Sequence, residues 1–92
     1  MAYYFFMYFV YIIQSETTSK YYIGMTSDIT KRLNYHNRGA SRYTRNKGPW
    51  VLVHRECFES KKEAWLRERQ IKSYKGGEAF KRLIGLKYGE VA

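Results

Sequence analysis

The sequence predicts a small α/β (α+β) domain with the element order β-β-α-β-α-α, in which helices cover the apolar faces of a small sheet. Three observations support this fold class. The chain has 92 residues, the length of one domain. Aromatic and β-branched runs recur three times, and the segments between and after them carry helix caps or glycine breaks. We therefore expect a single domain over residues 1–92, with its core from about residue 8 to residue 86.

The first two expected elements form a β-hairpin. The run from Met1 to Ile13 is almost entirely apolar, and from Tyr8 onward it has the aromatic and β-branched content of a strand covered on both faces. A signal peptide would have a basic residue before such a run and a small-residue cleavage site after it, and this run has neither, so a strand is favoured over export. The polar segment 14–20 then leads to a second strand over 21–25.

A helix, a loop and a third strand follow. The helix is expected over about residues 28–38, with Thr26 or Ser27 as its N-cap and a glycine at its end. Segment 39–49 is rich in glycine and polar residues and contains the single proline, so it is expected to be a surface loop. Segment 50–57 returns to β composition.

Two helices are expected to complete the domain. Ser60 and Glu63 have the spacing of a capping box, which opens a helix to about residue 74. The adjacent glycines at 76 and 77 break it, and a shorter helix is expected over about residues 78–84, where three apolar side chains are available for packing.

The net charge indicates the class of partner. The chain has 17 Lys and Arg residues against 8 Asp and Glu residues, a formal charge of +9, which favours a polyanion and above all nucleic acid. No stretch approaches the roughly 20 apolar residues that span a bilayer, so no membrane partner is expected. The single cysteine, Cys57, can form neither an internal disulfide nor a cysteine-rich zinc site, which favours a reducing cytoplasm.

Basic and aromatic residues alternate in the middle of the chain, where residues 29–55 include no acid. Phosphate neutralisation supplies affinity for nucleic acid, and aromatic faces stack on unpaired bases. A merely soluble basic face is the alternative, and the lack of compensating acids favours binding over it. The residues expected to bind nucleic acid are Lys31, Arg38, Arg42, Tyr43, Arg45 and Lys47.

Four other residues are candidates for chemistry. Arg32 and His36 are four residues apart on the first helix and therefore point to one side, beside the core. Without other evidence, His36 is interpreted as a histidine packed at the edge of the core, and Arg32 as a residue that binds phosphate or simply carries a surface charge. Tyr11 and Tyr22 lie on adjacent strands and can face each other or a shared cleft, although tyrosines in strands are usually packing residues.

Glu68 is the unusual residue of the second helix, because its spacing places it on the same face as Ala64 and Ile71, toward the domain. An unpaired buried charge is costly, so Glu68 either pairs with a cation such as Arg32 or binds a metal ion. The other seven acids are expected at turns, caps or exposed positions. One carboxylate suits magnesium, which keeps most of its waters.

Several motifs follow one another in a fixed order along nearly the whole chain: Val10-Tyr11-Ile12, Tyr22-Ile23-Gly24, Arg32 with His36, GASRYTR at 39–45, WVLV at 50–53, and Glu68. In this order they resemble the GIY-YIG endonuclease family, in particular its short stand-alone bacterial members of the UPF0213 kind. These are related to the amino-terminal nuclease domain of the excision-repair incision subunit. The resemblance implies a three-stranded antiparallel sheet flanked by helices, and hydrolysis of a nucleic-acid phosphodiester bond.

The resemblance also implies roles for individual residues and a Mg²⁺ or Mn²⁺ cofactor. Carried over position by position, the paired tyrosines are Tyr11 and Tyr22, the phosphate-binding arginine is Arg32, the metal ligand is Glu68, the accessory histidine is His36, and the glycine that lets backbone approach the active surface is Gly24. A tyrosine base has a pKa of about 10, so roughly one in a thousand is ionised at pH 7. We expect nearby cations to favour the phenolate, and a pH optimum above neutral.

The expected function is therefore that of a metal-dependent endonuclease that cleaves DNA in preference to RNA. We expect it to recognise the structure of its substrate and to act in DNA repair or recombination. The alternative is a nucleic-acid-binding module with little or no intrinsic catalysis, and a basic structural protein on RNA is less favoured. The sequence has no appended DNA-binding domain, so target choice must come from this domain, from DNA structure or from a protein partner.

Overall fold

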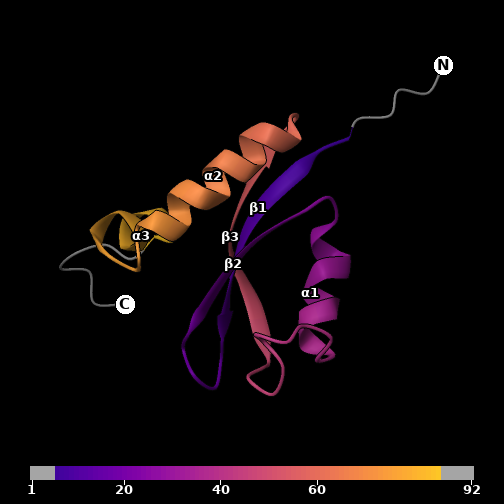
Figure 1. The fold of residues 1–92 in the computed structure, drawn as a ribbon. Helices are drawn as coiled ribbons and strands as arrows, with labels where there is room; N and C mark the ends of the chain where they lie inside the picture. The colour runs from indigo at the N-terminus through magenta and orange to yellow at the C-terminus, as the bar shows by residue number, and fades with distance from the viewer. Residues whose placement is uncertain (1–5, 86–92) are drawn as a thin grey trace.

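The computed structural model describes residues 6–85, in which a three-stranded antiparallel sheet has helix α1 on one face and helices α2 and α3 on the other (Figure 1). This arrangement confirms the predicted element order β-β-α-β-α-α. The start of the apolar run at Met1 and the end of the expected core at residue 86 lie outside the described residues. Among residues 6–85, no helix has the length and apolar character needed to cross a membrane.

The sheet has the strand order β2-β1-β3, with β1 (Tyr8–Ser15) between β2 (Tyr21–Thr26) and β3 (Trp50–Phe58). The central position explains the sequence of β1, since a strand with helices over both faces has no side that can be polar. Four consecutive residues, 10–13, are buried. In the register with β2, Tyr11 lies opposite Gly24, and this pairing governs the site described below.

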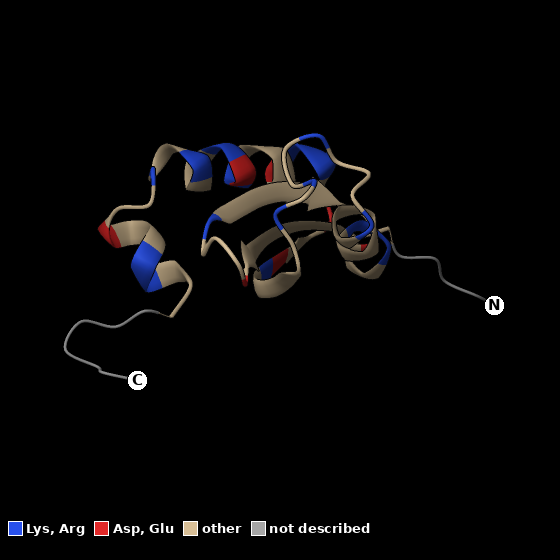
Figure 2. Ribbon diagram, turned by 90° about the horizontal axis from the view of Figure 1, so that it is seen from below, with Lys and Arg blue, Asp and Glu red and all other residues tan. Residues whose placement is uncertain are grey.

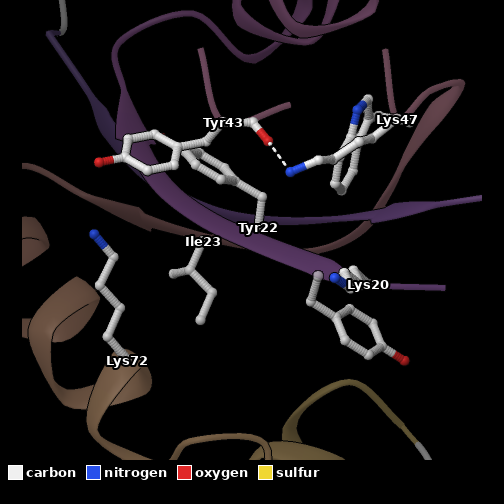
Figure 3. A pocket seen from close by; sticks show the side chains of 8 residues that line it. Lys20, Tyr22, Ile23, Tyr43, Lys47 and Lys72 are labelled. Carbon is white, nitrogen blue, oxygen red and sulfur yellow. Dashed lines mark hydrogen bonds between the residues drawn. The ribbon is translucent and has the colours of Figure 1, made fainter. Parts of the chain in front are cut away.

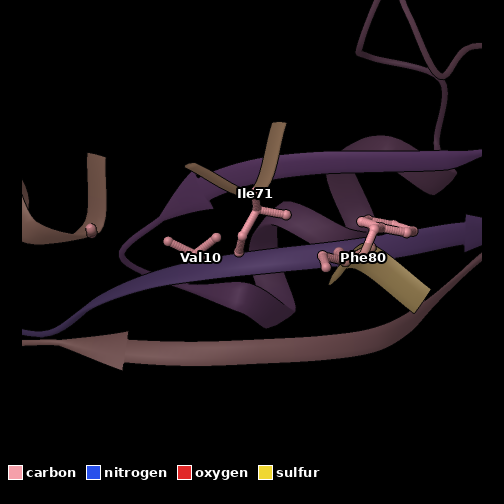
Figure 4. Close-up of a cluster of buried hydrophobic side chains, with 5 residues drawn as sticks. Val10, Ile71 and Phe80 are labelled. Atoms are coloured by element: carbon pink, nitrogen blue, oxygen red, sulfur yellow. The ribbon is translucent and has the colours of Figure 1, made fainter. Parts of the chain in front are cut away.

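Alternate side chains of β1 divide the interior into two clusters, one on each face of the sheet. Val10 and Ile12 pack with Ala64 and Ile71 of α2 (Lys61–Ser73) and with Phe80 of α3 (Glu78–Leu83) (Figure 4). The second cluster lies on the α1 side and consists of Tyr11, Ile13 and Trp50, with Ile29 and Leu33 of α1 packed against it. A tyrosine that belongs to a buried cluster is held in one position.

The N-cap of α1 (Ile29–Asn37) differs from the prediction, which placed it at Thr26 or Ser27. Asp28 is the cap, and its carboxylate accepts a hydrogen bond of 3.0 Å from the backbone N–H of Lys31. Thr26 is still part of β2, and its hydroxyl accepts a hydrogen bond of 3.1 Å from the backbone N–H of Asp28. The helix therefore begins later than predicted, because this threonine is used in the turn that leads into it.

The start of α2 shows the serine half of its predicted capping box, since the Ser60 hydroxyl accepts a hydrogen bond of 3.3 Å from the backbone N–H of Glu63.

The loop between α1 and β3 is tied to the sheet at both ends. The Asn37 side chain donates to the Trp50 carbonyl at 3.0 Å and accepts from the Trp50 N–H at 2.7 Å. The Ser15 hydroxyl, at the end of β1, donates to the Lys47 carbonyl. The predicted surface loop is thus anchored, and two of its residues, Ser41 and Thr44, are buried.

Hydrogen bonds centred on the Glu56 carboxylate connect α2 to β3. Glu56 accepts two hydrogen bonds from the Arg67 guanidinium, at 2.8 and 3.0 Å, and lies 2.7 Å from the His54 ring. The prediction that all acids other than Glu68 occupy turns, caps or exposed positions is therefore wrong for Glu56. Burial raises the pKa of the Glu56 carboxyl, but the hydrogen bonds from Arg67 and His54 outweigh it, and the net pKa is lowered.

We expect Glu56→Gln to lower the free energy of unfolding by about 1–2 kcal/mol at pH 7, because it leaves a half-buried guanidinium without its charged partner. Urea denaturation measures the change, with Glu59→Gln as a control at an exposed residue of the same segment. Because folding lowers the pKa of Glu56, its stabilisation is lost as the pH falls below the ordinary value of 4.5, and the two proteins should converge there. Equal stability at pH 7 would contradict this account.

Candidate active site

The candidate site is built around the Tyr11 phenol, which lies 2.8 Å from Nε2 of His36. The other ring nitrogen of His36, Nδ1, lies 2.8 Å from the hydroxyl of Thr44. All three side chains are buried, and they come from β1, from α1 and from the anchored loop. Neutral histidine has one N–H, so the imidazole donates one of these hydrogen bonds and accepts the other.

Thr44 is the residue of this chain of hydrogen bonds that sequence reasoning missed. It lies inside the GASRYTR motif, but nothing in the local pattern distinguishes it from the other polar residues of a surface loop. It is 1% exposed, and its carbonyl accepts a 3.0 Å hydrogen bond from the Trp50 indole. Its place in this motif was the one signal in the sequence that could have identified it. Its burial could not be predicted, because it depends on how the loop folds onto β3.

The two predicted tyrosines are brought together. The ring centroids of Tyr11 and Tyr22 are 6.3 Å apart, and that of Tyr22 lies 4.7 Å from the His36 ring. Tyr35 contacts the same imidazole edge to face, with centroids 5.7 Å apart. His36 is therefore packed against three aromatic rings, those of Tyr11, Tyr22 and Tyr35. It is a core-edge residue, as one interpretation of the sequence had it, and it also makes hydrogen bonds through both ring nitrogens.

Gly24 leaves the space that the Tyr11 ring fills. A Cβ atom at this position would lie 2.4 Å from the Tyr11 hydroxyl oxygen and 2.5 Å from Cζ, far inside any allowed contact. The ring thus lies across the neighbouring strand, as expected for an aromatic residue paired with glycine. The structure thus gives Gly24 a packing role against the Tyr11 ring, and its role in letting backbone approach the active surface stays a prediction.

Arg32 lies on α1 beside Tyr35, with its guanidinium carbon 4.9 Å from the ring centroid. Arg38 approaches the same ring at 5.9 Å. Together with Lys31 they line a surface pocket of about 330 Å³, in which Asp28 is the single acid among the lining residues. Three cations around one hollow form a suitable place for a phosphate group.

Glu68 projects from α2 and is 16% exposed, as its predicted helix face requires. Its ion pair is with Lys72, at 3.3 Å and one helical turn away, so Glu68 does pair with a cation, but the partner is this lysine and not Arg32, the cation given as an example. The charge of Glu68 nevertheless acts on the Tyr11 phenol. Within residues 6–85 no group of three or more His, Cys, Asp or Glu residues is arranged to hold a metal ion. A single carboxylate fits magnesium, which keeps several waters.

Burial dominates the electrostatics of the site. Burial raises the pKa of Tyr11, and the neighbouring Tyr22 and Glu68 raise it further. The positive charge of Arg32 lowers it, but not enough to reverse the shift. Arg32 therefore favours the phenolate, as expected of a nearby cation, but burial outweighs it and the net pKa of Tyr11 is raised. Burial, followed by the charge of Arg32, lowers the pKa of His36, so the imidazole is neutral at neutral pH.

The residues predicted to bind nucleic acid fall into two exposed groups. Lys31 on α1 and Arg38 at its C-cap line the same pocket as Arg32. The others project from the loop between α1 and β3, where Tyr43 is 73% exposed; they are Arg42, Tyr43, Arg45 and Lys47. Figure 2 shows Lys and Arg positions along these loops and helices. The structure thus leaves all six predicted binding residues exposed.

Comparison with known proteins gives concordant results. A family model described as the GIY-YIG catalytic domain matches residues 7–80. UPF0213 protein HQ_3675A of Haloquadratum walsbyi is 43% identical over 67 residues, 72% of this chain and 74% of that protein. UPF0213 protein CPE1444 of Clostridium perfringens is 45% identical over 67 residues, 72% of this chain and 71% of that protein. The solution NMR structure of the UPF0213 protein BH0048 from Bacillus halodurans has a TM-score of 0.53 and 34% identity, covering 90% of this chain and 87% of that one.

Gly24→Ala tests the packing of the site. The added methyl group must displace the Tyr11 ring, so we expect a loss of about 1–3 kcal/mol in the free energy of unfolding, measured by urea denaturation. In a Tyr11→Leu background the obstructing ring is absent, and the same substitution should cost much less. An equal cost in both backgrounds would show that the contact with Tyr11 is not the reason for glycine.

Proposed function

This chain belongs to the GIY-YIG catalytic domain family, and from that membership we propose that it is a metal-dependent endonuclease that hydrolyses phosphodiester bonds in DNA. One observation carries the proposal. The imidazole of His36, the guanidinium of Arg32 and the carboxylate of Glu68 come from distant parts of the chain, and all three act on the Tyr11 phenol. Hydrolysis of a phosphodiester needs a proton acceptor, neutralisation of the phosphate charge and stabilisation of the leaving oxygen.

Arg32 supplies the charge for the phosphate. Its guanidinium shares the pocket of about 330 Å³ with Lys31 and Arg38, and contact with the Tyr35 ring fixes its direction. An arginine can donate two parallel hydrogen bonds to phosphate oxygens, which orients the group as well as neutralising it. In this role Arg32 binds the scissile phosphate, while its neighbours bind the adjacent part of the backbone.

Tyr11 and His36 supply the route for the proton. With the His36 proton on Nδ1, the imidazole donates to Thr44 and accepts from the Tyr11 phenol. The lone pairs of the phenol oxygen then remain free for a water molecule, and Tyr11 can take a proton from that water while its own passes to Nε2. This transfer avoids an isolated phenolate, which burial disfavours. Thr44 positions the imidazole and fixes its tautomer.

Glu68 is the ligand that we assign to a magnesium or manganese ion. When bound, the ion supplies additional positive charge to the phosphate and to the leaving oxygen. Glu68 suits this role because its carboxylate is half-buried on the inner face of α2 and has an exposed lysine as its partner. Lys72 is 53% exposed and can turn away into solvent at little cost.

The ion pair between Lys72 and Glu68 also favours a second candidate function, a nucleic-acid-binding module with little or no catalysis, because a carboxylate held by a lysine is not free for a metal. The two functions differ in what Glu68 contributes. In the nuclease it is needed for cleavage, and in the binding module its replacement changes nothing essential. We further propose a cytoplasmic setting, consistent with the single free Cys57, a structure-directed role in repair or recombination, and a protein partner for targeting.

Glu68→Gln and Tyr11→Phe should each reduce cleavage by about 10²- to 10⁴-fold, because each removes a group required in the transition state. The assay uses labelled single strand, duplex, flap, branched junction and RNA with Mg²⁺ or Mn²⁺, and DNA binding is measured in parallel. Glu63→Gln is the matched control, since it changes an exposed carboxylate near the start of the same helix. Cleavage that persists in Glu68→Gln would contradict the role of Glu68 as the metal ligand. DNA binding without cleavage by the natural protein on every substrate would support the binding module.

The cleavage rate should rise between about pH 7 and pH 9, by no more than about tenfold per pH unit. The transfer through His36 is available across this whole range, because the lowered pKa of His36 keeps its ring neutral. The rise comes from the growing fraction of Tyr11 that has already lost its proton and accepts the water proton directly, a fraction that increases throughout this range because burial raises the pKa of Tyr11. The folded protein holds the Tyr11 proton more tightly than the unfolded chain, so stability decreases as the pH rises above 10.0, and rates are measured below that value. A rate that falls from pH 7 to pH 9 in folded protein would contradict Tyr11 as the base.

A further inference from the structure

A surface pocket of about 480 Å³ extends along β2, the edge strand of the sheet, and lies beside the site described above. Its lining combines aromatic rings with three lysines and includes no carboxylate. Pockets that bind small organic groups usually measure about 300 to 1,000 Å³ and are mostly apolar with a few polar groups, and this pocket has that character. The roles assigned to the active-site residues do not account for it.

The aromatic walls come from three places in the chain. Trp50 is 3% exposed and its indole N–H is bonded to the Thr44 carbonyl at 3.0 Å, so it forms a fixed wall. Tyr22 is half-buried against His36, and Tyr43 projects from the loop with 73% of its surface exposed. Figure 3 shows the rings of Tyr22 and Tyr43 bordering the same space. An aromatic residue as exposed as Tyr43 has a free face for a partner.

The three lysines reach the pocket from three different segments. Lys20 precedes β2, Lys47 lies in the loop and Lys72 belongs to α2 (Figure 3). Lys47 donates one hydrogen bond to the Tyr43 carbonyl at 3.1 Å, and Lys72 contacts Glu68 at 3.3 Å. An ammonium group has three donors, so both retain donors for a phosphate. Cations that converge on stacking groups suit a nucleotide, which has a phosphate at one end and a flat base at the other.

We propose that this pocket binds an unpaired nucleotide of the DNA substrate, next to the bond that is cut. The inference rests on the proposed function and specifies its substrate class, which is DNA with a single-stranded segment at the cleavage position. Two residues connect the pocket to the active site. Tyr22 lines both, and Lys72 joins the pocket to the Glu68 carboxylate.

A paired base does not fit this arrangement. In a duplex each base is stacked above and below, so its flat faces are covered and a protein contacts its edges. An unpaired base can leave the stack and place a face against an aromatic side chain, and every base has such a face. The pocket therefore selects for the absence of pairing and not for a base sequence.

Binding without metal tests the pocket separately from catalysis. Fluorescence anisotropy in EDTA compares a labelled single strand, the matching duplex, and the duplex with an unpaired overhang. We expect the single strand and the overhang to bind at least tenfold more tightly than the blunt duplex. A 2-aminopurine base in the overhang should lose fluorescence on binding, because stacking on an aromatic ring quenches it.

Variants assign the effect to the pocket. Tyr43→Ala should weaken binding of the single strand about 5- to 100-fold and remove the quenching, while Tyr43→Phe preserves both. Blunt-duplex binding should change by less than about twofold in either variant. Trp65→Ala is the matched aromatic control, since this residue is 44% exposed on α2 and does not line the pocket.

Lys47→Gln should weaken binding and lower the slope of log affinity against log salt by about one, as expected for one lost phosphate contact. Lys62→Gln is the matched lysine control, located ten residues before Lys72 on the same helix and therefore about 15 Å from it.

Three results would overturn the proposal: equal affinity for single strand and blunt duplex, equal loss for both in Tyr43→Ala, or unquenched 2-aminopurine. These readouts do not depend on hydrolysis. If no substrate is cleaved with Mg²⁺ or Mn²⁺ but the binding results hold, the proposed function fails and the pocket stands. If cleavage occurs without preference for an unpaired segment, the nuclease stands and the pocket assignment fails.

Discussion

The contact between the Tyr11 phenol and the His36 imidazole is the interaction on which the rest of the site depends. It joins the central strand of the sheet to α1, and through Thr44 it also fixes the loop that leads to β3. The ring of Tyr11 can occupy this position because Gly24, its partner in the register, has no side chain. Strand pairing, helix position and loop conformation therefore meet at one buried polar contact. Buried polar groups of this kind constrain a structure strongly, because any rearrangement leaves them without partners.

The burial of Tyr11 and His36 explains how a strongly basic protein can keep these two side chains uncharged. The chain carries a net charge of +9, yet desolvation outweighs nearby cations at Tyr11 and keeps His36 uncharged. The charges instead surround this centre at exposed positions, where they attract a polyanion without ionising the groups that would move a proton. Arg32 lies at the boundary between these regions, since it lines an exposed pocket and also acts on both buried groups.

The two faces of the sheet have different tasks. The α1 face holds the tyrosines, the histidine and the arginine, while α2 on the other face contributes Glu68 and Lys72. The hydrogen bonds between Glu56 and Arg67 fasten α2 to β3 and so fix where these two side chains lie. The edge strand β2 lies between the two sets of groups, and the pocket along it connects them. An open sheet edge is usually protected from other chains, and in this protein the edge borders the surface that would contact the substrate.

The sequence by itself determined the order of the elements, the central buried strand, the Ser60 cap and the inward direction of Glu68, because each follows from a repeat or a spacing of a few residues. The family resemblance supplied the candidate site residues, and the structure brings Tyr11, Tyr22 and His36 together. The tertiary structure alone decided that Thr44 is buried, that Glu68 pairs with Lys72, and that burial outweighs the cations at Tyr11. These depend on contacts between residues far apart in the chain and on the water that packing excludes, and a local pattern contains neither.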